Sequence, residues 1–303
     1  MNYNATLYYP TIEFANKEWL WNACLLWDKV YRIVPEGYIP NDRDEIRTLI
    51  EDKSVIANIA PEKYATEIFE DFKKVMDKSK WACALSEADY MDNNYVKLHE
   101  GKADVQLREL LIAGKRDDEG FYHVPREFAN IYMIYLSNYI AKKNNITLAS
   151  DYDFSWLCSN FMESNGKLLD HDQGDNITKL GALTFANFIP RGIESLSAKE
   201  LLAFREKSKD ERHLFFDEMQ KFSDTIMNVN DEKIITDIFN ERIKDFQKCR
   251  DEYMKRMRDI KIEGFYGAKT VMFPLITTLA TSLMNVSSEV ARVLDVCGVC
   301  CGV

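Results

Sequence analysis

The longest regular pattern in this chain of 303 residues is a series of apolar side chains at helical spacing in its C-terminal third. Ser197 and Glu200 lie three residues apart, the spacing of a capping box, and predict the start of a helix. Apolar residues then recur mostly every three or four positions on both sides of an Asn- and Asp-rich turn at 228–231. They are Leu201, Phe204, Phe215, Met219, Phe222, Ile226, Ile235, Ile238, Phe246, Tyr253, Met257 and Ile260. We therefore predict a long antiparallel helical hairpin from Ser197 to about Ile260.

The N-terminal end of the chain has the pattern of a βαβ unit. Residues 6–14 are rich in β-branched and aromatic types and predict a strand, in which Pro10 favours an edge position or a bulge. Asn16 can cap a helix that runs through Trp27. The short apolar stretch 30–34 predicts a second strand, because Pro35 and Gly37 end it. Two strands joined by a helix normally lie parallel with a right-handed crossover.

The rest of the chain predicts mainly helices. Asp42 and Glu45 resemble a capping box, Pro61 suits a first helical turn, and residues 126–142 have the content of a buried helix. Residues 147–150 and 183–189 predict short strands, whereas 89–119 are polar and loop-rich except at 105–112. The polar, glycine-containing stretch 165–176 predicts an exposed loop or domain boundary.

The fold class that follows is α+β and helix-dominated. We expect a mixed α/β domain with a small sheet over residues 1–190. A second domain over 191–303 would hold the helical hairpin and an apolar C-terminal segment. With 46% hydrophobic residues, the chain can bury a substantial core.

The net charge of −10 disfavours nucleic acid as a partner, because an acidic protein is repelled by phosphate backbones. The densest basic window, 244–261, is interrupted by acidic residues and predicts a salt-bridged helix face rather than a nucleic-acid surface. The apolar segment 271–283 is shorter than the roughly 18 residues of a membrane span, so we expect a buried helix and no stable membrane span.

The cysteine pattern and the first residues predict a cytoplasmic protein. Seven cysteines, four of them far apart in the sequence, lack the paired spacing of a disulfide scaffold and predict reduced thiols. The chain opens MNYNATLYYP, without a basic stretch before an apolar run, so we expect no secretory signal.

Three aspartates are the candidate catalytic residues. Asp28 follows the first predicted helix, and Asp151 and Asp153 follow the predicted strand at 147–150. Carboxylates at strand and helix ends on one edge of an α/β sheet are typical of metal-dependent phosphoryl or hydrolytic chemistry. The sequence leaves a structural alternative open, in which Asp28 pairs with Lys29 or Arg32 and Asp151 caps the next helix.

Two further groups of residues could bind a metal. Cys297, Cys300 and Cys301 form a CxxCC cluster that could supply part of a zinc or redox site, but no second CxxC or HxxxH provides a fourth ligand. Idle terminal thiols fit this cluster better. His171 lies in HDQGDN, where oxygen and imidazole ligands could hold a divalent cation, although a polar surface loop has the same composition. The sequence therefore identifies no cofactor.

Three stretches combine aromatic, proline and charged residues in a distinctive order: YYPTIEF followed by WLWNACLLWDKVYRIVP, then IYMIYLSNYIAKKNNITLASDYDF, then FIPRGIESLSAKELLAFREKSKDERHLFF. In these stretches the chain resembles an uncharacterised bacterial family, a domain of unknown function. The resemblance spans most of the chain and is lost near DVCGVCCGV at the C-terminus. It implies a bacterial cytoplasmic protein with a gene neighbourhood of mobile elements or phage defence. It supplies no catalytic residues.

Three functions remain open at this level, of which the third, membrane-directed toxicity through residues 271–283, would require that segment to leave the fold. The long apolar hairpin predicts a protein-interaction or regulatory module, which would bind a protein partner or self-associate through the hairpin. The alternative is a metal-dependent hydrolase or nuclease that uses Asp28, Asp151 and Asp153. That alternative requires the three carboxyl groups to converge in one cleft.

Overall fold

The structure is a computed structural model, and it describes residues 2–9, 11–52, 55–75, 95–111, 116–151 and 193–226, together with single helical positions between 234 and 256. The elements of the first part are β1 (Asn2–Tyr8), α1 (Lys17–Leu26), β2 (Lys29–Ile33), α2 (Asp44–Glu51), β3 (Ile56–Ile59) and α3 (Glu62–Val75). They are followed by β4 (Tyr95–His99), η1 (Glu100–Lys102), α5 (Val105–Leu111), β5 (Phe121–Pro125), α6 (Arg126–Asn144), β6 (Ile146–Ala149), η2 (Ile193–Ser195), α9 (Ala198–Lys207) and α10 (Lys209–Ile226). The described part of the chain is helix-dominated with a small parallel sheet, as the sequence predicts.

The central sheet has the strand order β3-β2-β1-β6, and every neighbouring pair is parallel. This confirms the predicted βαβ order, in which the side chain of Asn16 accepts a hydrogen bond from the backbone N–H of Trp19 at 3.0 Å and caps α1. The prediction of the first strand was wrong in its bounds and position: β1 is Asn2–Tyr8 rather than 6–14, and it lies inside the sheet between β2 and β6 rather than at an edge. Residues 11–14 belong to the loop that follows, where the Thr11 hydroxyl donates to the carbonyl of Glu13. All strands begin at one edge of the sheet, the amino edge, and end at the other, the carboxyl edge. The chain moves outward from β1 to β3 and returns on the other side with β6, so the strand order reverses between β1 and β6.

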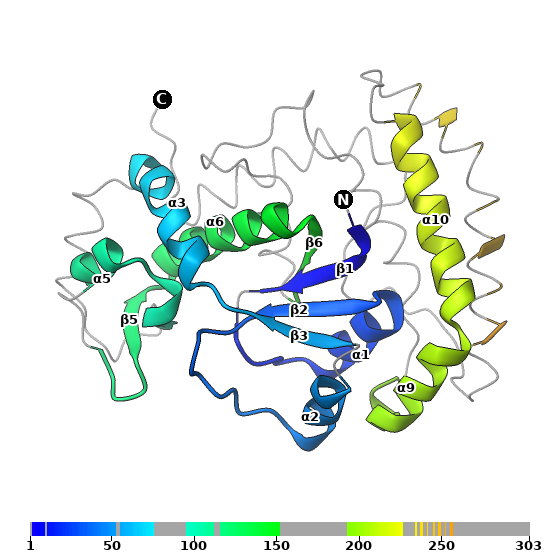
Figure 1. The fold of residues 1–303 in the computed structure, drawn as a ribbon, viewed down its shortest axis with the longest axis horizontal. Coiled ribbons are helices and arrows are strands. Elements are labelled where there is room, and N and C mark those ends of the chain that lie inside the picture. The colour runs from blue at the N-terminus through cyan, green and yellow to red at the C-terminus, as the bar shows by residue number, and fades with distance from the viewer. Residues whose placement is uncertain are drawn as a thin grey trace.

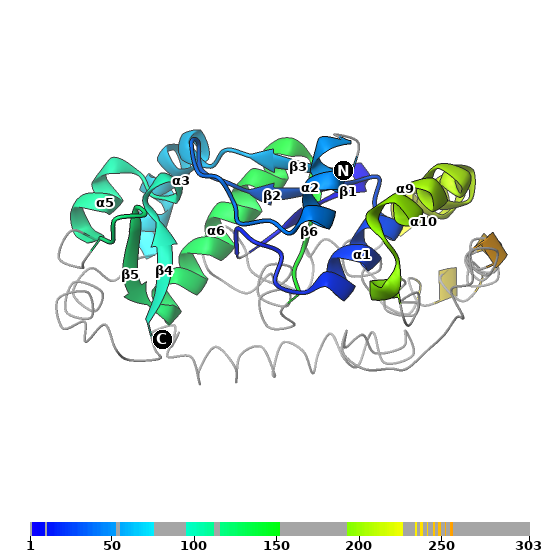
Figure 2. The same cartoon turned by 90° about the horizontal axis from the view of Figure 1, so that it is seen from below.

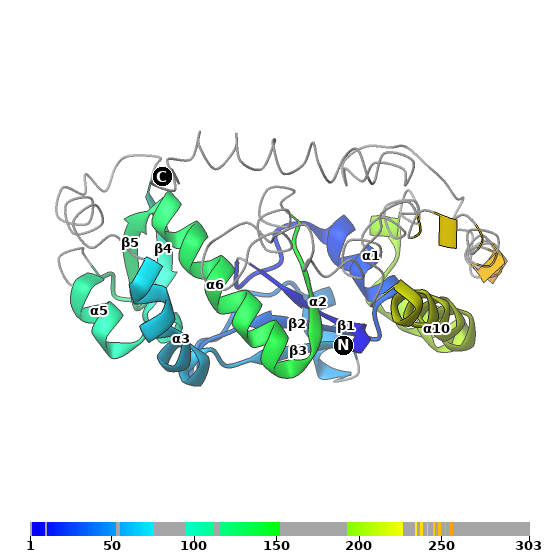
Figure 3. The same cartoon turned by 90° about the horizontal axis from the view of Figure 1, so that it is seen from above.

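Two hydrophobic clusters cover the two faces of the sheet, because successive residues of a strand point to opposite sides. Leu7 faces α3 and α6, whereas the next residue, Tyr8, faces α1, α2 and α9. Helix α6 lies across one face (Figure 3), and α1 lies against the other (Figure 2). Helices α9 and α10 lie beyond the amino edge, and α3, α5 and β5 lie towards the opposite end of the molecule (Figure 1).

An antiparallel pair of strands, β4 and β5, occupies part of the region that the sequence predicts as loop-rich. The pair runs from Tyr95 opposite Pro125 to His99 opposite Phe121. In β4 the polar Lys97 and His99 alternate with the apolar Val96 and Leu98, and in β5 His123 lies between the buried Tyr122 and Val124. Both strands therefore carry the alternation of a half-buried strand over a few residues, a signal that the prediction of a loop-rich region overlooked. The stretch 105–112, which is excepted from the predicted loop-rich region without an assigned structure, contains α5.

The spacing of Asp42 and Glu45 predicts that Asp42 caps α2, and this prediction was wrong. The residue at the N-cap is Arg43, which makes no side-chain capping bond. Asp42 instead forms a bidentate ion pair with Arg32 on β2, at 2.7 and 2.6 Å, and the two residues are only 6% and 1% exposed. Asn58 on β3 accepts a further hydrogen bond from Arg32 at 2.9 Å. A buried guanidinium requires a carboxylate, and this requirement overrides the local capping preference.

The capping box at Ser197 and Glu200 is confirmed, but the helix that follows ends at Lys207. A new helix, α10, begins after Ser208, whose hydroxyl donates to the carbonyl of Phe204 at 2.9 Å. Most of the second helix of the predicted hairpin, the strand at 183–189, the loop at 165–176, the domain boundary near 190 and the segment 271–283 lie outside the described residues. In the described part, no helix has the length and apolarity needed to cross a membrane.

Candidate functional site

The structure places Asp28 and Asp151 at opposite edges of the sheet. Asp28 directly precedes β2, and Asp151 lies two residues after β6. Arg32 and Ala149 both pair with Tyr8 on β1. Asp28 is four residues before Arg32, and Asp151 is two residues after Ala149. The two aspartates are therefore about six residues apart along the strand direction, which is about 20 Å. The two carboxyl groups therefore do not share a cleft, and Asp153 lies outside the described residues.

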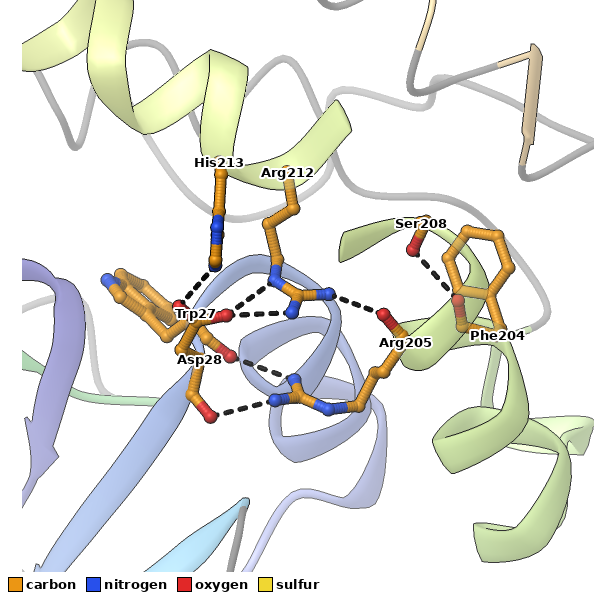
Figure 4. A network of polar contacts seen from close by, with 7 residues as sticks. All are labelled: Trp27, Asp28, Phe204, Arg205, Ser208, Arg212 and His213. Carbon is orange, nitrogen blue, oxygen red and sulfur yellow. Dashed lines mark hydrogen bonds and ion pairs between the residues drawn. The ribbon is translucent and has the colours of Figure 1, made fainter. Parts of the chain in front are cut away.

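Asp28 is bound by two residues of the first turn of α10 (Figure 4). Arg212 reaches Oδ1 with Nε at 2.9 Å and with Nη2 at 2.7 Å. His213 contacts Oδ2 through Nε2 at 2.8 Å. Both carboxylate oxygens are thus engaged by side chains 184 and 185 residues further along the chain.

Arg205, at the end of α9, also binds the segment that contains Asp28. Its guanidinium donates to the backbone carbonyls of Trp27 and Asp28 at 2.8 and 2.7 Å, while Arg212 donates to the carbonyl of Arg205 at 3.1 Å. Arg205 and Arg212 are only 7% and 4% exposed. We call Asp28, Arg205, Arg212 and His213 the Asp28 cluster. It joins α9 and α10 to the end of α1 and the start of β2.

The electrostatics of the Asp28 cluster favour a charged carboxylate. Burial acts to raise the pKa of Asp28, but the charge and hydrogen bonds of Arg212 and the hydrogen bond of His213 outweigh it and hold the pKa below its ordinary value. The expected partners, Lys29 and Arg32, do not bind Asp28, since Lys29 lies over the ring of Tyr31 and Arg32 pairs with Asp42. A carboxylate whose oxygens face a guanidinium is poorly placed to bind a metal cation, so Asp28 has a structural role here.

Asp151 has a different environment, at the carboxyl edge beside the point where the strand order reverses. In open α/β sheets this switch point is where ligands bind. Asp151 Oδ1 lies 3.0 Å from the hydroxyl of Tyr8, which in turn lies 2.9 Å from the hydroxyl of Thr11. Thr11 donates to the backbone carbonyl of Glu13 at 2.8 Å. We call Asp151, Tyr8, Thr11 and the Glu13 carbonyl the Asp151 hydrogen-bond chain.

Burial raises the pKa of Asp151 and outweighs the hydrogen bonds from Tyr8, from the backbone N–H of Asn16 and from its own backbone N–H. The bond from Asn16 places the carboxyl group at the N-terminal end of α1. In related architectures this helix end receives the phosphate of a nucleotide. Here Asp151 and the side chain of Asn16 already accept hydrogen bonds from N–H groups at that end. Asp151 therefore accepts a hydrogen bond at the N-terminal end of α1, and the helix that the sequence predicts it to cap lies outside the described residues.

A further group of side chains lies around the loops after β1 and β2. Tyr38 donates to Glu13 Oε1 at 3.0 Å, and burial together with this carboxylate raises the pKa of Tyr38 to about 12. The ring of Tyr38 packs against His99, whose Nδ1 accepts from the N–H of Gly101 at 3.0 Å. Burial lowers the pKa of Lys102 to about 8, an effect that the charge of Glu13 opposes. These residues come from separate segments, so no local motif in the sequence indicated them.

In the parts of the chain that the structure describes, no three His, Cys, Asp or Glu side chains are grouped closely enough to hold a metal ion. His171 and the cluster of Cys297, Cys300 and Cys301 lie outside those parts. No protein-family model matches the chain, no curated protein matches its sequence, and no solved structure matches its fold.

Proposed function

We propose that this chain is a protein-interaction or regulatory module of the bacterial cytoplasm, and that its C-terminal helices form the surface that binds a protein partner. The observation that supports this proposal most directly is the attachment of α10. The Asp28 cluster holds the first turn of α10, while Leu214, one residue beyond His213, is 48% exposed.

The exposed side of α10 has a helical pattern. Asp210, Leu214, Asp217, Lys221 and Thr225 are exposed at intervals of three or four residues, which places them on one face of the helix. Leu214 is the apolar residue among them. A helix of this length presents a face of about 27 Å, and its first turn is held in place by buried arginines rather than by flexible surface residues.

The chain beyond α10 returns towards its first turn. Arg256 forms an ion pair with Glu211, and Ile238 and Cys249 pack against the hydrophobic cluster that contains α9. These contacts are the ones that an antiparallel hairpin would make. Ile234, at 49% exposed, adds a second exposed apolar residue in this part of the chain. The net charge of −10 favours a protein rather than a nucleic acid as the partner.

The test is to place a photo-crosslinking amino acid at Leu214 in the full chain and to irradiate cells that express it. A control protein carries the same amino acid at Glu206, an exposed residue of α9. We expect a crosslinked product, with a second copy or another protein, from position 214 and much less from position 206.

A second measurement moves the crosslinking amino acid to Asp217, on the same exposed face of α10, and adds either Leu214→Arg or Glu206→Arg, which introduce the same side chain on neighbouring helices. We expect Leu214→Arg to reduce the crosslinked complex, or the dimer mass in light scattering, at least tenfold relative to Glu206→Arg. Equal crosslinking at positions 214 and 206, together with a monomeric mass for the unchanged protein, would overturn the proposal.

Catalysis by a metal-dependent hydrolase or nuclease is the alternative that the sequence left open. Asp28 gives it no support, because both of its carboxylate oxygens are bound by Arg212 and His213. Asp151 is about 20 Å away along the strands, so the predicted set of three carboxylates would have to act without Asp28.

A further inference from the structure

The Asp151 hydrogen-bond chain contains more contacts than its hydroxyl groups have protons. Its three contacts join Asp151 to Tyr8, Tyr8 to Thr11, and Thr11 to the carbonyl of Glu13. A carbonyl and an ionised carboxylate only accept hydrogen bonds, and each hydroxyl donates one. Tyr8 and Thr11 therefore supply two protons for three contacts.

Ionisation of Asp151 removes one of these hydrogen bonds. When the carboxylate is charged, the proton of Tyr8 is directed to Asp151 and Thr11 has one proton for two acceptors, Tyr8 and the Glu13 carbonyl. The backbone N–H of Ala15 donates to the Tyr8 oxygen whatever the charge of Asp151, and it supplies no proton to the three contacts of the chain. When Asp151 is protonated, it donates to Tyr8, Tyr8 donates to Thr11, and Thr11 donates to Glu13. Every contact in the chain then has a proton.

We propose that Asp151 is the proton-binding residue of a pH-sensitive contact between the end of β6 and the loop from β1 to α1, complete only when Asp151 is protonated. This contact lies beyond the interaction role proposed above and does not depend on it. Its ligand is a proton.

The surroundings of Asp151 favour its protonated form, as the hydrogen-bond chain does. Burial raises the pKa of its carboxyl group, and the hydrogen bonds that favour the charged form are too weak to reverse the effect. Of the described residues, the titratable side chain that faces Asp151 is Tyr8 on β1, and the loop contributes the neutral N–H of Asn16. Burial raises the pKa of Tyr8 as well, so Tyr8 keeps its proton throughout the range in which Asp151 titrates.

The contact fastens the start of α1. Tyr8 ends β1, Thr11 and Glu13 lie in the loop, and Asn16 caps the helix. The far end of α1 is held by the Asp28 cluster through Trp27 and Asp28. Loss of a proton at Asp151 therefore weakens the attachment of one end of α1 and leaves the attachment of the other unchanged.

The experiment is an NMR titration of the aspartate side-chain carboxyl carbons in the full-length protein. The Asp151 signal is assigned in the unchanged protein, and its loss in Asp151→Asn confirms the assignment. We expect the Asp151 signal to titrate above the ordinary aspartate pKa of about 3.9. In Thr11→Val, Tyr8 has one proton and one acceptor, so ionised Asp151 is fully satisfied. The Asp151 midpoint should then fall by about 0.5 to 1 pH unit, the effect of roughly one hydrogen bond.

The matched control is Thr147→Val on β6, which removes a hydroxyl that donates to the carbonyl of Ala5 at 3.0 Å and takes no part in the chain. We expect it to leave the Asp151 midpoint unchanged. A midpoint at or below the ordinary value in the unchanged protein overturns the proposal, even if no variant folds. An equal shift in Thr11→Val and Thr147→Val, or no shift in Thr11→Val, overturns it too.

Discussion

Asp28 and Asp151 are both partly buried and lie near opposite ends of the same helix, α1, but their surroundings shift their pKa values in opposite directions. Burial alone raises the pKa of a carboxyl group, and Asp151, which faces hydroxyl and N–H groups, shows that effect. Asp28 faces the charged Arg212 and also His213, and these partners reverse the effect. Partial burial alone therefore does not decide the direction in which the pKa of an aspartate shifts, because a cationic partner can reverse it.

The two shifts give opposite dependences of stability on pH. The lowered pKa of Asp28 stabilises the fold above the unfolded-state pKa, and this contribution is lost as the pH falls through the folded-state value. The raised pKa of Asp151 stabilises the fold below the unfolded-state pKa, and this contribution is lost as the pH rises through the folded-state value. Acid therefore weakens one end of α1 and strengthens the other.

The largest effect is expected from Asp28→Ala. Removal of the carboxylate leaves Arg212, which is 4% exposed, as a buried charge without its partner. The free energy of unfolding at neutral pH should fall by about 3 kcal/mol, near the lower limit for a broken buried pair, because Asp28 itself is partly exposed. Urea denaturation measures the loss. Asp217→Ala, at an exposed position of α10, should change stability by less than about 0.5 kcal/mol, and equal losses in the two variants would remove the role assigned to Asp28.

Arg212→Lys should have a smaller effect, a loss of about 2 kcal/mol in the same measurement. A lysine keeps the positive charge but cannot bind Asp28 Oδ1 through two nitrogens while also reaching the carbonyl of Arg205. The control is Arg256→Lys, because Arg256 is 54% exposed in its pair with Glu211. We expect less than about 0.5 kcal/mol there. If both variants lose the same stability, the geometry of the guanidinium has no importance in the Asp28 cluster.

The comparison of the two aspartates is tested directly by Asp28→Asn and Asp151→Asn, each measured from about pH 2 to about pH 7, so that the range includes the lowered folded-state pKa of Asp28. The stability difference between the unchanged protein and Asp28→Asn should grow as the pH rises from acid. The difference for Asp151→Asn should change in the opposite direction by about 1 kcal/mol, because an amide can donate to Tyr8 at every pH. Two profiles of the same sign would show that the environments are not opposed.

The smallest effect is expected from Thr11→Val. Thr11 accepts from Tyr8 and donates to Glu13 when Asp151 is protonated, but has one proton for two acceptors when Asp151 is charged. The loss of stability should be about 1 kcal/mol at acid pH and about half of that at neutral pH. Denaturation at the two pH values measures it, with Thr147→Val as the control whose loss should not depend on this titration. A larger loss at neutral pH would contradict the assigned direction of the hydrogen bonds.

Much of the described fold follows from short stretches of sequence. Helix α1 with its cap at Asn16, strand β2, the capping box at Ser197 and helix α6 all lie where the sequence predicts them, whereas β1 begins and ends earlier than predicted. Each depends on signals within a few residues, such as the alternation of a strand, the periodicity of a helix, or a side chain that reaches the next turn. These signals do not require knowledge of the path of the chain.

Which polar side chains bind one another depends on the path of the chain in the folded structure. Asp28 meets Arg212 across 184 residues, and Tyr8 meets Asp151 across 143. Asp42 has the local spacing of a helix cap, yet the packed structure pairs it with Arg32. A hydrogen bond or ion pair between distant segments forms only after the sheet and helices have brought them together, and the stability gained by satisfying a buried charge exceeds that of a surface cap. Residue types and spacing therefore determined the elements, while packing determined which aspartate is ion-paired and which one has its pKa raised by burial.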